Sequence, residues 1–374
     1  MPYAHIVGWG KYLPGKPLTT ADLAARAGIE LDDEWIRSRS GIQTRHFAGE
    51  KEFASTMSIK AARDALEMAD LDASKLDLVI VATNSADYHF PSTACLVQDA
   101  LGASHAGAFD LVAGCAGFLY ALTVADRFIR SGAHHAILVV GTERASAVMD
   151  LQDKGTCAFF GDGAGAVVLK AGEQPGGLLG FTLGADGSGG DLLILPAGGS
   201  RLPVSQEVLD KKLQYGRMDG ASMYRFGLKA IAQATKEALR QANVTLEEID
   251  LFIPHQSNAR LIQQAVQNLK ISPEKVFVNV DRYANTSSAA LPLAICDAVE
   301  AGRLHPGDHV LFATFGAGLT WAGAVFQWAV PKPARPLPPW HRAWHALRDT
   351  LSALHSLWLR LVHWWDARWG ENGK

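Results

Sequence analysis

Cys115 has the sequence surroundings expected of a reactive cysteine. It stands in FDLVAGCAGFLYAL, where a strand-like run ends at small residues and a helix-like run begins just after the cysteine. The free N–H groups and the dipole at a helix N-terminus stabilise a thiolate, so we expect a lowered pKa for Cys115. The alternative, a small buried apolar residue, stays open for Cys115. For the other three cysteines, Cys95, Cys157 and Cys296, we predict the role of a small buried apolar residue.

Two other polar residues stand where a strand-like run gives way to a helix-like run. His255 lies in IDLFIPHQSNARLI, and the ends of strands in α/β sheets often carry functional groups. Asn285 lies in RYANTSSAALPLAI, directly before a helix-like run, where asparagine is more often a helix cap. The chain has 13 histidines, and most of them must be structural, so the surroundings alone assign neither residue a catalytic role.

Two glycine-rich runs have different predicted roles. The run GDGAGA at 161–166 fits a loose dinucleotide-binding pattern, but strand-like VVLK follows it where such a site requires a helix. We therefore reject a nucleotide site there. The run FGAG at 315–318 follows the apolar HVLFAT, and its backbone N–H groups could face a developing oxyanion. A tight turn is the other interpretation of FGAG.

The composition is that of an ordinary globular protein. Of the 374 residues, 48% are hydrophobic and 20% are charged, and the net charge of −3 gives no sign of nucleic-acid binding. The four cysteines are far apart and form no CxxC pair, so we expect reduced thiols, a cytoplasmic location and no metal site. We expect neither a signal peptide nor a spanning helix, because no suitable apolar run is present.

The chain also resembles itself at a separation of about 170 residues. The segment 61–78, AARDALEMADLDASKLDL, aligns without a gap with 234–251, ATKEALRQANVTLEEIDL. The segments 130–143 and 303–317 match in the same order, each with a helix end, a turn and an apolar strand. Wholly apolar strands that alternate with helices are typical of sheets buried between helix layers. We therefore predict two α/β halves around a pseudo-twofold axis, with a site that takes residues from both.

This pattern divides the chain into four parts. The first half, 1–172, carries Cys115, and the second half, 173–330, carries His255 and Asn285. The Pro-rich run PKPARPLPP at 331–339 predicts a stiff linker, which a tail at 340–374 follows.

The tail differs from the rest of the chain. Six of the ten tryptophans lie in 340–369, and from 331 onward seven basic residues face three acidic ones. Apolar residues at heptad spacing predict one amphipathic helix: Trp340, Trp344, Leu347, Leu351, Leu354, Trp358, Leu361 and Trp365. Tryptophan with arginine is typical of a helix in a membrane interface. Two interpretations stay open, namely contact of 340–369 with the anionic inner face of the membrane and packing onto the catalytic body or a dimer mate.

Together the motifs resemble those of β-ketoacyl-acyl-carrier-protein synthase III, an initiating condensing enzyme of the thiolase superfamily. The resemblance covers about residues 3–330 and rests on AGCAGF around Cys115, PHQSN around His255, YANTSSA around Asn285, and the runs GDGAGAVVL and FGAGLTWAG. It implies a duplicated thiolase-like α/β fold with five αβαβα layers. The amphipathic helix predicted from the spacing in the tail is an addition to that fold, because members of the family usually end near residue 330.

The same resemblance implies an acyltransferase of fatty acid or related biosynthesis, which needs no cofactor besides its substrates. Cys115 would take the acyl group from acyl-CoA. His255 and Asn285 would hydrogen-bond the thioester carbonyl of malonyl-acyl carrier protein while CO₂ leaves, and the carbanion would attack the acyl group. The backbone N–H groups of Cys115 and Ala317 would hold the oxyanion. The family often has glycine where Ala317 stands, and alanine costs little there unless its φ is positive.

Further residues match the positions that bind CoA in this family. Trp35 and Arg39, in DEWIRSRSGI, match residues that hold the adenine end of CoA. Lys154, in QDKGT, stands where the family often has an arginine on the opposite face of the adenine, and lysine stacks less well than arginine.

Another three residues match positions that contact proteins. Arg225 and Arg260 match basic residues that dock the acidic acyl carrier protein. Phe90, in HFPS, matches a loop residue that shapes the acyl pocket across the interface of a homodimer.

Other functions fit parts of this pattern. The order Cys, His, Asn also occurs in papain-like proteases, but their C-G-S-C-W pattern is missing around Cys115. Relatives with the same fold make hydroxymethylglutaryl-CoA, join two acyl chains, or transfer acyl groups to other acceptors in specialised metabolism. His255 with Asn285, instead of a catalytic glutamate, favours decarboxylative condensation. A scaffold without enzymatic activity is a third alternative.

Overall fold

The first of two large sheets is built from the N-terminal half of the chain. The computed structural model of the protein describes residues 1–329 and positions 347, 350, 351, 354, 357, 358, 360–362, 364, 365 and 368. The sheet contains β1 (Tyr3–Tyr12), β4 (Leu78–Ala82), β5 (Gly107–Leu111), β6 (Ala136–Glu143) and β7 (Gly163–Gly172). Their order is β1-β7-β6-β4-β5, with β4 parallel to β5 and β6, and β7 antiparallel to β1 and β6. Every residue of β4 and β6 is buried, which explains their continuous apolar runs.

The second sheet repeats four of these five strands. It contains β8 (Gly177–Ala185), β11 (Leu251–Pro254), β12 (His309–Gly316) and β13 (Thr320–Gln327). The order is β11-β12-β13-β8, and β11 runs parallel to β12 as β4 does to β6. The second sheet has no fifth strand among the described residues. At the position that corresponds to the pairing of β5 with β4, a single parallel bridge joins Val276 to Phe252 of β11.

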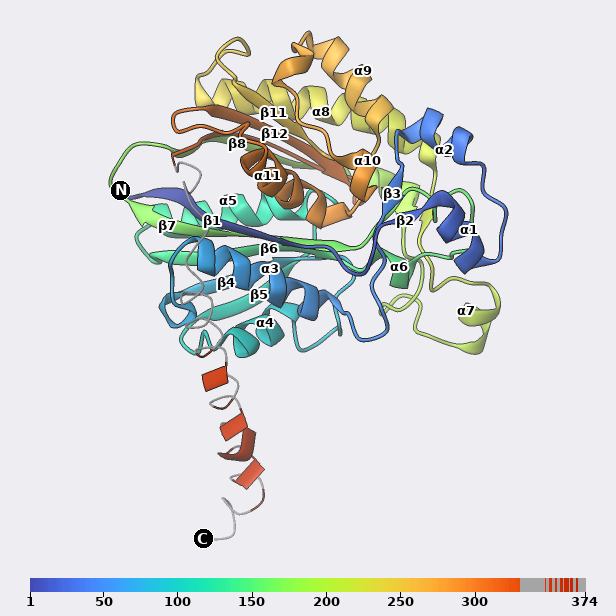
Figure 1. Ribbon diagram of the computed structural model, residues 1–374, viewed down its shortest axis with the longest axis horizontal. Coiled ribbons are helices and arrows are strands. Elements are labelled where there is room, and N and C mark those ends of the chain that lie inside the picture. The colour runs from blue at the N-terminus through green and yellow to red at the C-terminus, as the bar shows by residue number, and fades with distance from the viewer. Residues whose placement is uncertain are drawn as a thin grey trace.

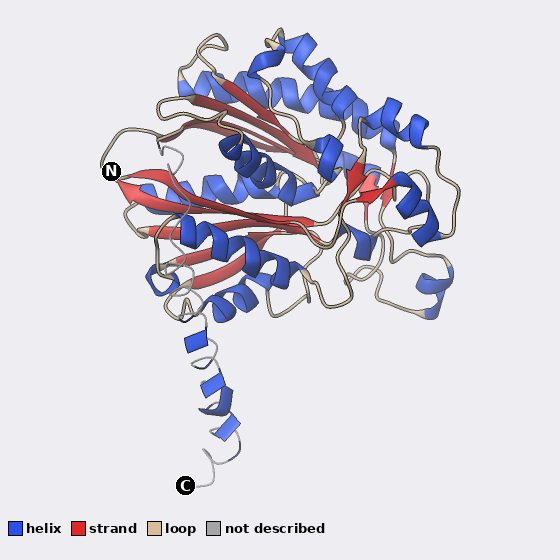
Figure 2. Ribbon diagram, viewed as in Figure 1, coloured by secondary structure: helices blue, strands red, loops and turns tan. Residues whose placement is uncertain are grey.

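Helices cover both sheets in a stack of five layers (Figure 2). The outer face of the first sheet carries α3 (Ala54–Met68) and α4 (Thr93–Leu101), and the outer face of the second carries α8 (Gly220–Ala242) and α9 (Ala259–Leu269). Between the sheets lie α5 (Gly117–Arg130) and α11 (Ala290–Glu300), as Figure 1 shows. Ten of the eleven residues of α11 are buried because it contacts both sheets. The five-layered thiolase-like fold predicted from the sequence is confirmed.

The internal sequence repeat corresponds to repeated elements. The segment 61–78 covers the end of α3 and the start of β4, and 234–251 covers the end of α8 and the start of β11. In the first half, the chain passes from β5 through a loop with Cys115 into the central helix α5. In the second half, it passes from the segment at Val276 through a loop with Asn285 into the central helix α11. The duplication therefore places Cys115 and Asn285 at corresponding points.

Shorter elements gather at one end of the stack (Figure 1). They are β2 (Leu18–Thr19), β3 (Thr44–Arg45), β9 (Leu193–Ile194), β10 (Arg217–Met218), α1 (Thr20–Ala27), α2 (Asp33–Ser40), α6 (Ala145–Val148), α7 (Gln206–Asp210) and α10 (Val280–Tyr283). The strands form two small antiparallel pairs, β2 with β3 and β9 with β10. The end of α2 approaches the start of α9, where the side chain of Asn258 donates a hydrogen bond to the carbonyl of Arg39 over 3.1 Å.

In the tail, the described residues are helical and largely exposed. Eight large apolar side chains there are between 50% and 61% exposed: Leu347, Leu351, Leu354, Leu357, Trp358, Leu361, Trp364 and Trp365. Arg360 forms an ion pair of 2.6 Å with Asp99 of α4. The predicted linker at 331–339, Trp340 and Trp344 lie outside the described residues. Among the described residues, none of the helices combines the length and apolar character that crossing a membrane requires.

Candidate active site

Cys115 lies where loops of the two halves meet. It precedes Ala116, the N-cap residue of α5, and its side chain is buried. A Cβ atom at Gly114, whose φ is +55°, would lie 2.5 Å from the carbonyl oxygen of Ala317. A Cβ atom at Gly316 would lie 2.3 Å from the backbone nitrogen of Cys115. These two contacts require glycine, because any other residue would push the loops apart.

The expected lowering of the Cys115 pKa is wrong for the free protein. Burial has the largest effect and raises the pKa of the thiol to about 11, with a smaller contribution in the same direction from the charge of Glu143. Hydrogen bonds from the Ser287 hydroxyl and from the backbone N–H groups of Cys115 and Ala317 lower the pKa, but by less than burial raises it. The sequence correctly predicted that Cys115 stands just before a helix. It did not predict the burial, which raises the pKa of the thiol.

The prediction for the other cysteines is correct in two cases. Cys157 and Cys296 are buried, whereas Cys95 is exposed. Cys95 lies on α4, whose buried side is formed by Ala94, Val97 and Leu101, and its side chain falls on the opposite side of the helix.

His255 follows directly after β11 and is held by the neighbouring strand. Its backbone N–H donates to the carbonyl of Ala313 in β12 over 2.8 Å. The ring packs edge-on against Phe315, with ring centroids 5.3 Å apart. Burial lowers the pKa of His255 to about 3, so the imidazole is neutral at physiological pH. A neutral imidazole has one N–H to donate and one nitrogen to accept.

Asn285 is held at its backbone and at its side chain. Its backbone N–H donates to the carbonyl of Phe159, and its own carbonyl accepts from the N–H of Gly161, each over 3.0 Å. The side-chain Oδ1 accepts from the backbone N–H of Ser287 over 2.8 Å. Because that N–H can only donate, the contact identifies the oxygen of the amide. The NH₂ group is therefore the part of the amide that can donate to a ligand.

One pocket of about 540 Å³ brings the three residues together. Cys115, His255 and Asn285 all line it, although Cys115 precedes the other two by more than a hundred residues in the chain. Trp35, Arg39 and Arg260 line the same pocket and are exposed, so they form its outer part. The guanidinium of Arg39 lies 5.8 Å from the centre of the Trp35 ring.

Other residues singled out in the sequence lie elsewhere. The described residues that line this pocket do not include Lys154, Arg225 or Phe90. Two neighbours in the chain do line it, namely Gly155, next to Lys154, and Tyr224, next to Arg225. Phe90 is 86% exposed. Ala317 lines a second cavity of about 230 Å³, which also reaches Cys115. The φ of Ala317 is not positive, so alanine fits this position without strain.

A polar group that no sequence pattern predicted lies beside Cys115. The hydroxyl of Ser287 donates to the sulfur of Cys115 over 3.3 Å. The side-chain nitrogen of Asn84 donates to Glu143, over 2.8 Å, and also to the hydroxyls of Ser287 and Ser288. The only sequence signal was the position of Ser287 within YANTSSA, where several small polar residues could equally well have been helix caps.

Two family models match this chain. The model for 3-oxoacyl-[acyl-carrier-protein (ACP)] synthase III matches residues 109–187, which include Cys115. The model for the C-terminal part of the same family matches residues 239–328, which include His255 and Asn285.

Whole proteins of this family are also similar to the chain. The β-ketoacyl-[acyl-carrier-protein] synthase III of Roseiflexus sp. strain RS-1 is 47% identical over 87% of this chain and 98% of its own length. The crystal structure of 3-oxoacyl-[acyl-carrier-protein] synthase III from Aquifex aeolicus VF5 superposes with a TM-score of 0.79, at 40% identity over 87% of this chain and 100% of that one. The priming β-ketosynthase of the R1128 polyketide pathway superposes with a TM-score of 0.81, at 34% identity over 88% of this chain and 97% of that one. This chain therefore belongs to the β-ketoacyl-[acyl-carrier-protein] synthase III family.

Proposed function

We propose that this chain uses Cys115, His255 and Asn285 to extend an acyl group by decarboxylative condensation with malonyl-acyl carrier protein. As a member of its family, the chain is an acyltransferase of the condensing type. The observation that carries the residue assignment is the shared pocket, where a cysteine before a helix meets the two potential hydrogen-bond donors His255 and Asn285.

In the first half-reaction, the sulfur of Cys115 attacks the thioester carbonyl of acyl-CoA. A bond forms between the sulfur and the acyl carbon, the bond from that carbon to the CoA sulfur breaks, and the thiol proton passes overall to the departing CoA. The backbone N–H groups of Cys115 and Ala317 already face the Cys115 sulfur, as their effect on its pKa indicates. They are therefore placed to receive the oxyanion that forms next to that sulfur.

In the second half-reaction, His255 and Asn285 act on the malonyl thioester. The N–H of neutral His255 and the NH₂ of Asn285 donate to the thioester carbonyl, which becomes an enolate as the bond to CO₂ breaks. The enolate carbon then bonds to the acyl carbon on Cys115. The carbon–sulfur bond breaks, and the thiolate of Cys115 takes up a proton. The depressed pKa of His255 suits this role, because the ring then acts as a hydrogen-bond donor without carrying a charge.

The exposed part of the pocket supports the binding of CoA and carrier protein. Trp35 and Arg39 lie where they could flank an adenine, and Lys154 is next to the lining residue Gly155. Arg260 lines the pocket, and exposed Arg225 is next to the lining residue Tyr224. We assign Arg260 and Arg225 to the acidic carrier protein, because exposed cations attract such a partner over a distance.

The second cavity is suited to the acyl group. It reaches Cys115, and apolar side chains form much of its wall: Val148, Met149, Leu193, Ile194, Leu195 and Met218. Phe90 does not line this cavity in its own chain. We therefore propose that Phe90 contributes to the cavity of the partner chain in a homodimer. Exposed Tyr88, Phe90 and Val112 and the position of β5 at the sheet edge support such an interface.

The exposed tail favours contact with a membrane surface over packing on the chain's own body. Eight large apolar side chains among its described residues are at least half exposed, so at least half of the surface of each is open to a further contact. Tryptophans, leucines and the nearby Arg360 and Arg368 form the composition that binds the interface of an anionic bilayer. We therefore propose a reversible peripheral contact through 340–369.

Mass spectrometry of Cys115 tests the central assignment. Incubation with a mixture of acyl-CoAs should add one acyl group to the peptide that contains Cys115, and malonyl-acyl carrier protein should then remove it as a 3-oxoacyl product. The acyl group that accumulates identifies the preferred starter. An acyl group on another residue, or none at all, would overturn the assignment.

A further inference from the structure

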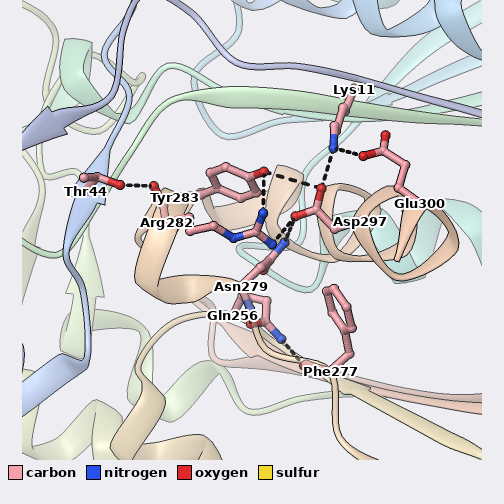
Figure 3. A network of polar contacts seen from close by, with 9 residues as sticks. All are labelled: Lys11, Thr44, Gln256, Phe277, Asn279, Arg282, Tyr283, Asp297 and Glu300. Atoms are coloured by element: carbon pink, nitrogen blue, oxygen red, sulfur yellow. Dashed lines mark hydrogen bonds and ion pairs between the residues drawn. The ribbon is translucent and has the colours of Figure 1, made fainter. Parts of the chain in front are cut away.

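A buried carboxylate on the central helix α11 joins several parts of the second half. Asp297 is 4% exposed and accepts four hydrogen bonds (Figure 3). Its Oδ2 accepts from the side-chain nitrogen of Asn279 over 2.9 Å and from Arg282 over 2.8 Å. Its Oδ1 accepts from Lys11 over 2.5 Å and from the hydroxyl of Tyr283 over 3.4 Å.

Three of these four donors belong to the segment that leads into Asn285. Asn279, Arg282 and Tyr283 come from α10 and the residue before it, only a few residues before Asn285. Between them and Asn285 lies Ala284, whose φ of +58° is unusual for a residue with a side chain. Such a conformation persists only where its surroundings impose it. The bonds to Asp297 hold the segment before Ala284.

The same segment also holds the residue after His255. The backbone N–H of Asn279 donates to the side-chain oxygen of Gln256 over 2.8 Å. The side-chain nitrogen of Gln256 donates in turn to the carbonyls of Pro254 and Phe277, over 2.8 and 3.1 Å. Figure 3 shows this continuous path from Asp297 through Asn279 to Gln256. His255 and Asn285 are therefore both tied to Asp297, although they belong to different loops.

The fourth donor comes from the first half of the chain. Lys11 lies on β1, and its ammonium group also binds Glu300, over 2.6 Å. Burial alone would lower the pKa of Lys11, but its hydrogen bonds to Asp297 and Glu300 outweigh that effect and raise the pKa. A second link between the halves joins the hydroxyl of Thr44 to the carbonyl of Arg282 over 2.7 Å. The segment before Asn285 is thus held against β1 of the first sheet and against β3.

We propose that Asp297 is a positioning residue, which sets His255 and Asn285 for the malonyl half-reaction and leaves acyl transfer to Cys115 largely independent. The inference rests on the division of labour proposed above. The contacts of Asp297 lead to the segments that carry His255 and Asn285, whereas Cys115 is carried by the loop between β5 and α5. A displacement of the two donors by about 1 Å is enough to cost a large part of the rate.

The substitution Asp297→Asn tests the carboxylate with little change in shape. Each oxygen of Asp297 accepts two donors, so the NH₂ group of an asparagine would face two donors whichever way the amide is turned. Leaving buried donors unpaired should displace the loop. The matched control is Glu300→Gln, which also changes a carboxylate that binds Lys11 into an amide.

Two rates should be measured for each variant. The first is acylation of Cys115 by acetyl-CoA in a single turnover, and the second is CO₂ release from malonyl-acyl carrier protein by enzyme that has been acylated beforehand. For Asp297→Asn we expect acylation to stay within about threefold of the parent and CO₂ release to fall by at least about tenfold. Glu300→Gln should retain both rates. Equal losses in both rates for Asp297→Asn, or no loss in either, would overturn the inference.

Two further outcomes concern the folding of Asp297→Asn and the dependence of the parent enzyme on His255 and Asn285. If Asp297→Asn does not fold, as judged by circular dichroism, Arg282→Met replaces it, because that side chain is half exposed. A selective loss of CO₂ release then supports the role of Asp297, and an even loss or none overturns it. A parent enzyme whose CO₂ release does not depend on His255 and Asn285 would overturn the proposed function as well. If CO₂ release by the parent does depend on His255 and Asn285, but Asp297→Asn releases CO₂ at the parent rate, only the inference about Asp297 is overturned.

Discussion

The hydroxyl of Ser287 donates a hydrogen bond to the sulfur of Cys115 over 3.3 Å and so connects the second half of the chain to the residue we propose as nucleophile. This bond lowers the pKa of Cys115, whereas burial raises it. We therefore expect Ser287→Ala to raise the pKa of the thiol further. Alkylation of Cys115 near neutral pH should slow by about two- to tenfold, because a typical hydrogen bond contributes about 0.5–1.5 kcal/mol.

The measurement is the rate of iodoacetamide labelling of the Cys115 peptide as a function of pH, followed by mass spectrometry. Peptide resolution is needed because Cys95 is exposed and will also react, whereas Cys115 is buried. The pH profile of Ser287→Ala should move to higher pH, while labelling of Cys95 stays constant in the same sample. An unchanged profile for Cys115 would show that the hydroxyl does not act on the sulfur in solution.

Substitution of the three pocket residues should separate the two half-reactions. Cys115→Ala and Cys115→Ser should abolish formation of the acyl-enzyme. His255→Ala and Asn285→Ala should still acylate Cys115 but lose about 10²–10³-fold in CO₂ release, since each removes one donor to the enolate oxygen. Single-turnover acylation and CO₂ release measure the two steps. A Cys115→Ala enzyme that condenses at the parent rate would contradict the mechanism.

The pH dependence of decarboxylation should show no titration of His255 in the usual histidine range. Burial lowers the pKa of His255 to about 3, so its ring stays neutral as the pH falls from about 8 to about 5. The donated N–H therefore persists over this range, and CO₂ release should not fall on account of His255. A loss with a midpoint near pH 6.5 that disappears in His255→Gln would contradict this expectation.

Arg260→Glu should weaken the use of the carrier protein more than that of CoA. Arg260 is exposed at the outer part of the pocket, and reversing its charge should raise KM for malonyl-acyl carrier protein by about tenfold at low salt. The effect should shrink at high ionic strength, where exposed charges are screened. Lys236→Glu, an exposed change of charge on α8, serves as the control. Equal losses with acyl-CoA and carrier protein would refute the assignment.

Truncation after Val330 should abolish vesicle binding without affecting catalysis. The whole chain should float with anionic vesicles and less with neutral ones, because both apolar insertion and the local positive charge contribute. The truncated chain should bind neither and should keep its condensing activity. If truncation unfolds the enzyme or changes its oligomeric mass, the apolar face packs against protein instead. If whole and truncated chains float equally poorly, the membrane proposal is wrong.

Residue patterns near element boundaries were sufficient to predict much of the pocket. Cys115, His255 and Asn285 each stood between a strand-like and a helix-like run, and the structure places all three in one pocket. The strand predicted after GDGAGA, which was the reason to reject a nucleotide site there, is confirmed, since β7 begins within that run and continues beyond it. These features depend on local periodicity, which a sequence expresses directly.

Features that depend on distant contacts could not be predicted. The raised pKa of Cys115 results from burial between two halves, and no local pattern states how closely two loops approach. Asp297 lies in the apolar helix sequence ALPLAICDAVE, where a single aspartate gives no indication that Lys11 will reach it from β1. The boundary predicted between 172 and 173 stays a prediction, although β7 ends at Gly172 and β8 begins at Gly177.

The corresponding positions of Cys115 and Asn285 have a consequence for how such a site can arise. In a dimer of identical halves, every substitution appears twice, so a loop that gains a nucleophile gains it on both sides. Once the halves are fused in one gene, each loop before a central helix can change by itself. The loop before α5 could then specialise for covalent attack and the loop before α11 for binding a carbonyl oxygen. Fusion thus permits a division of roles between the two loops that symmetry forbids.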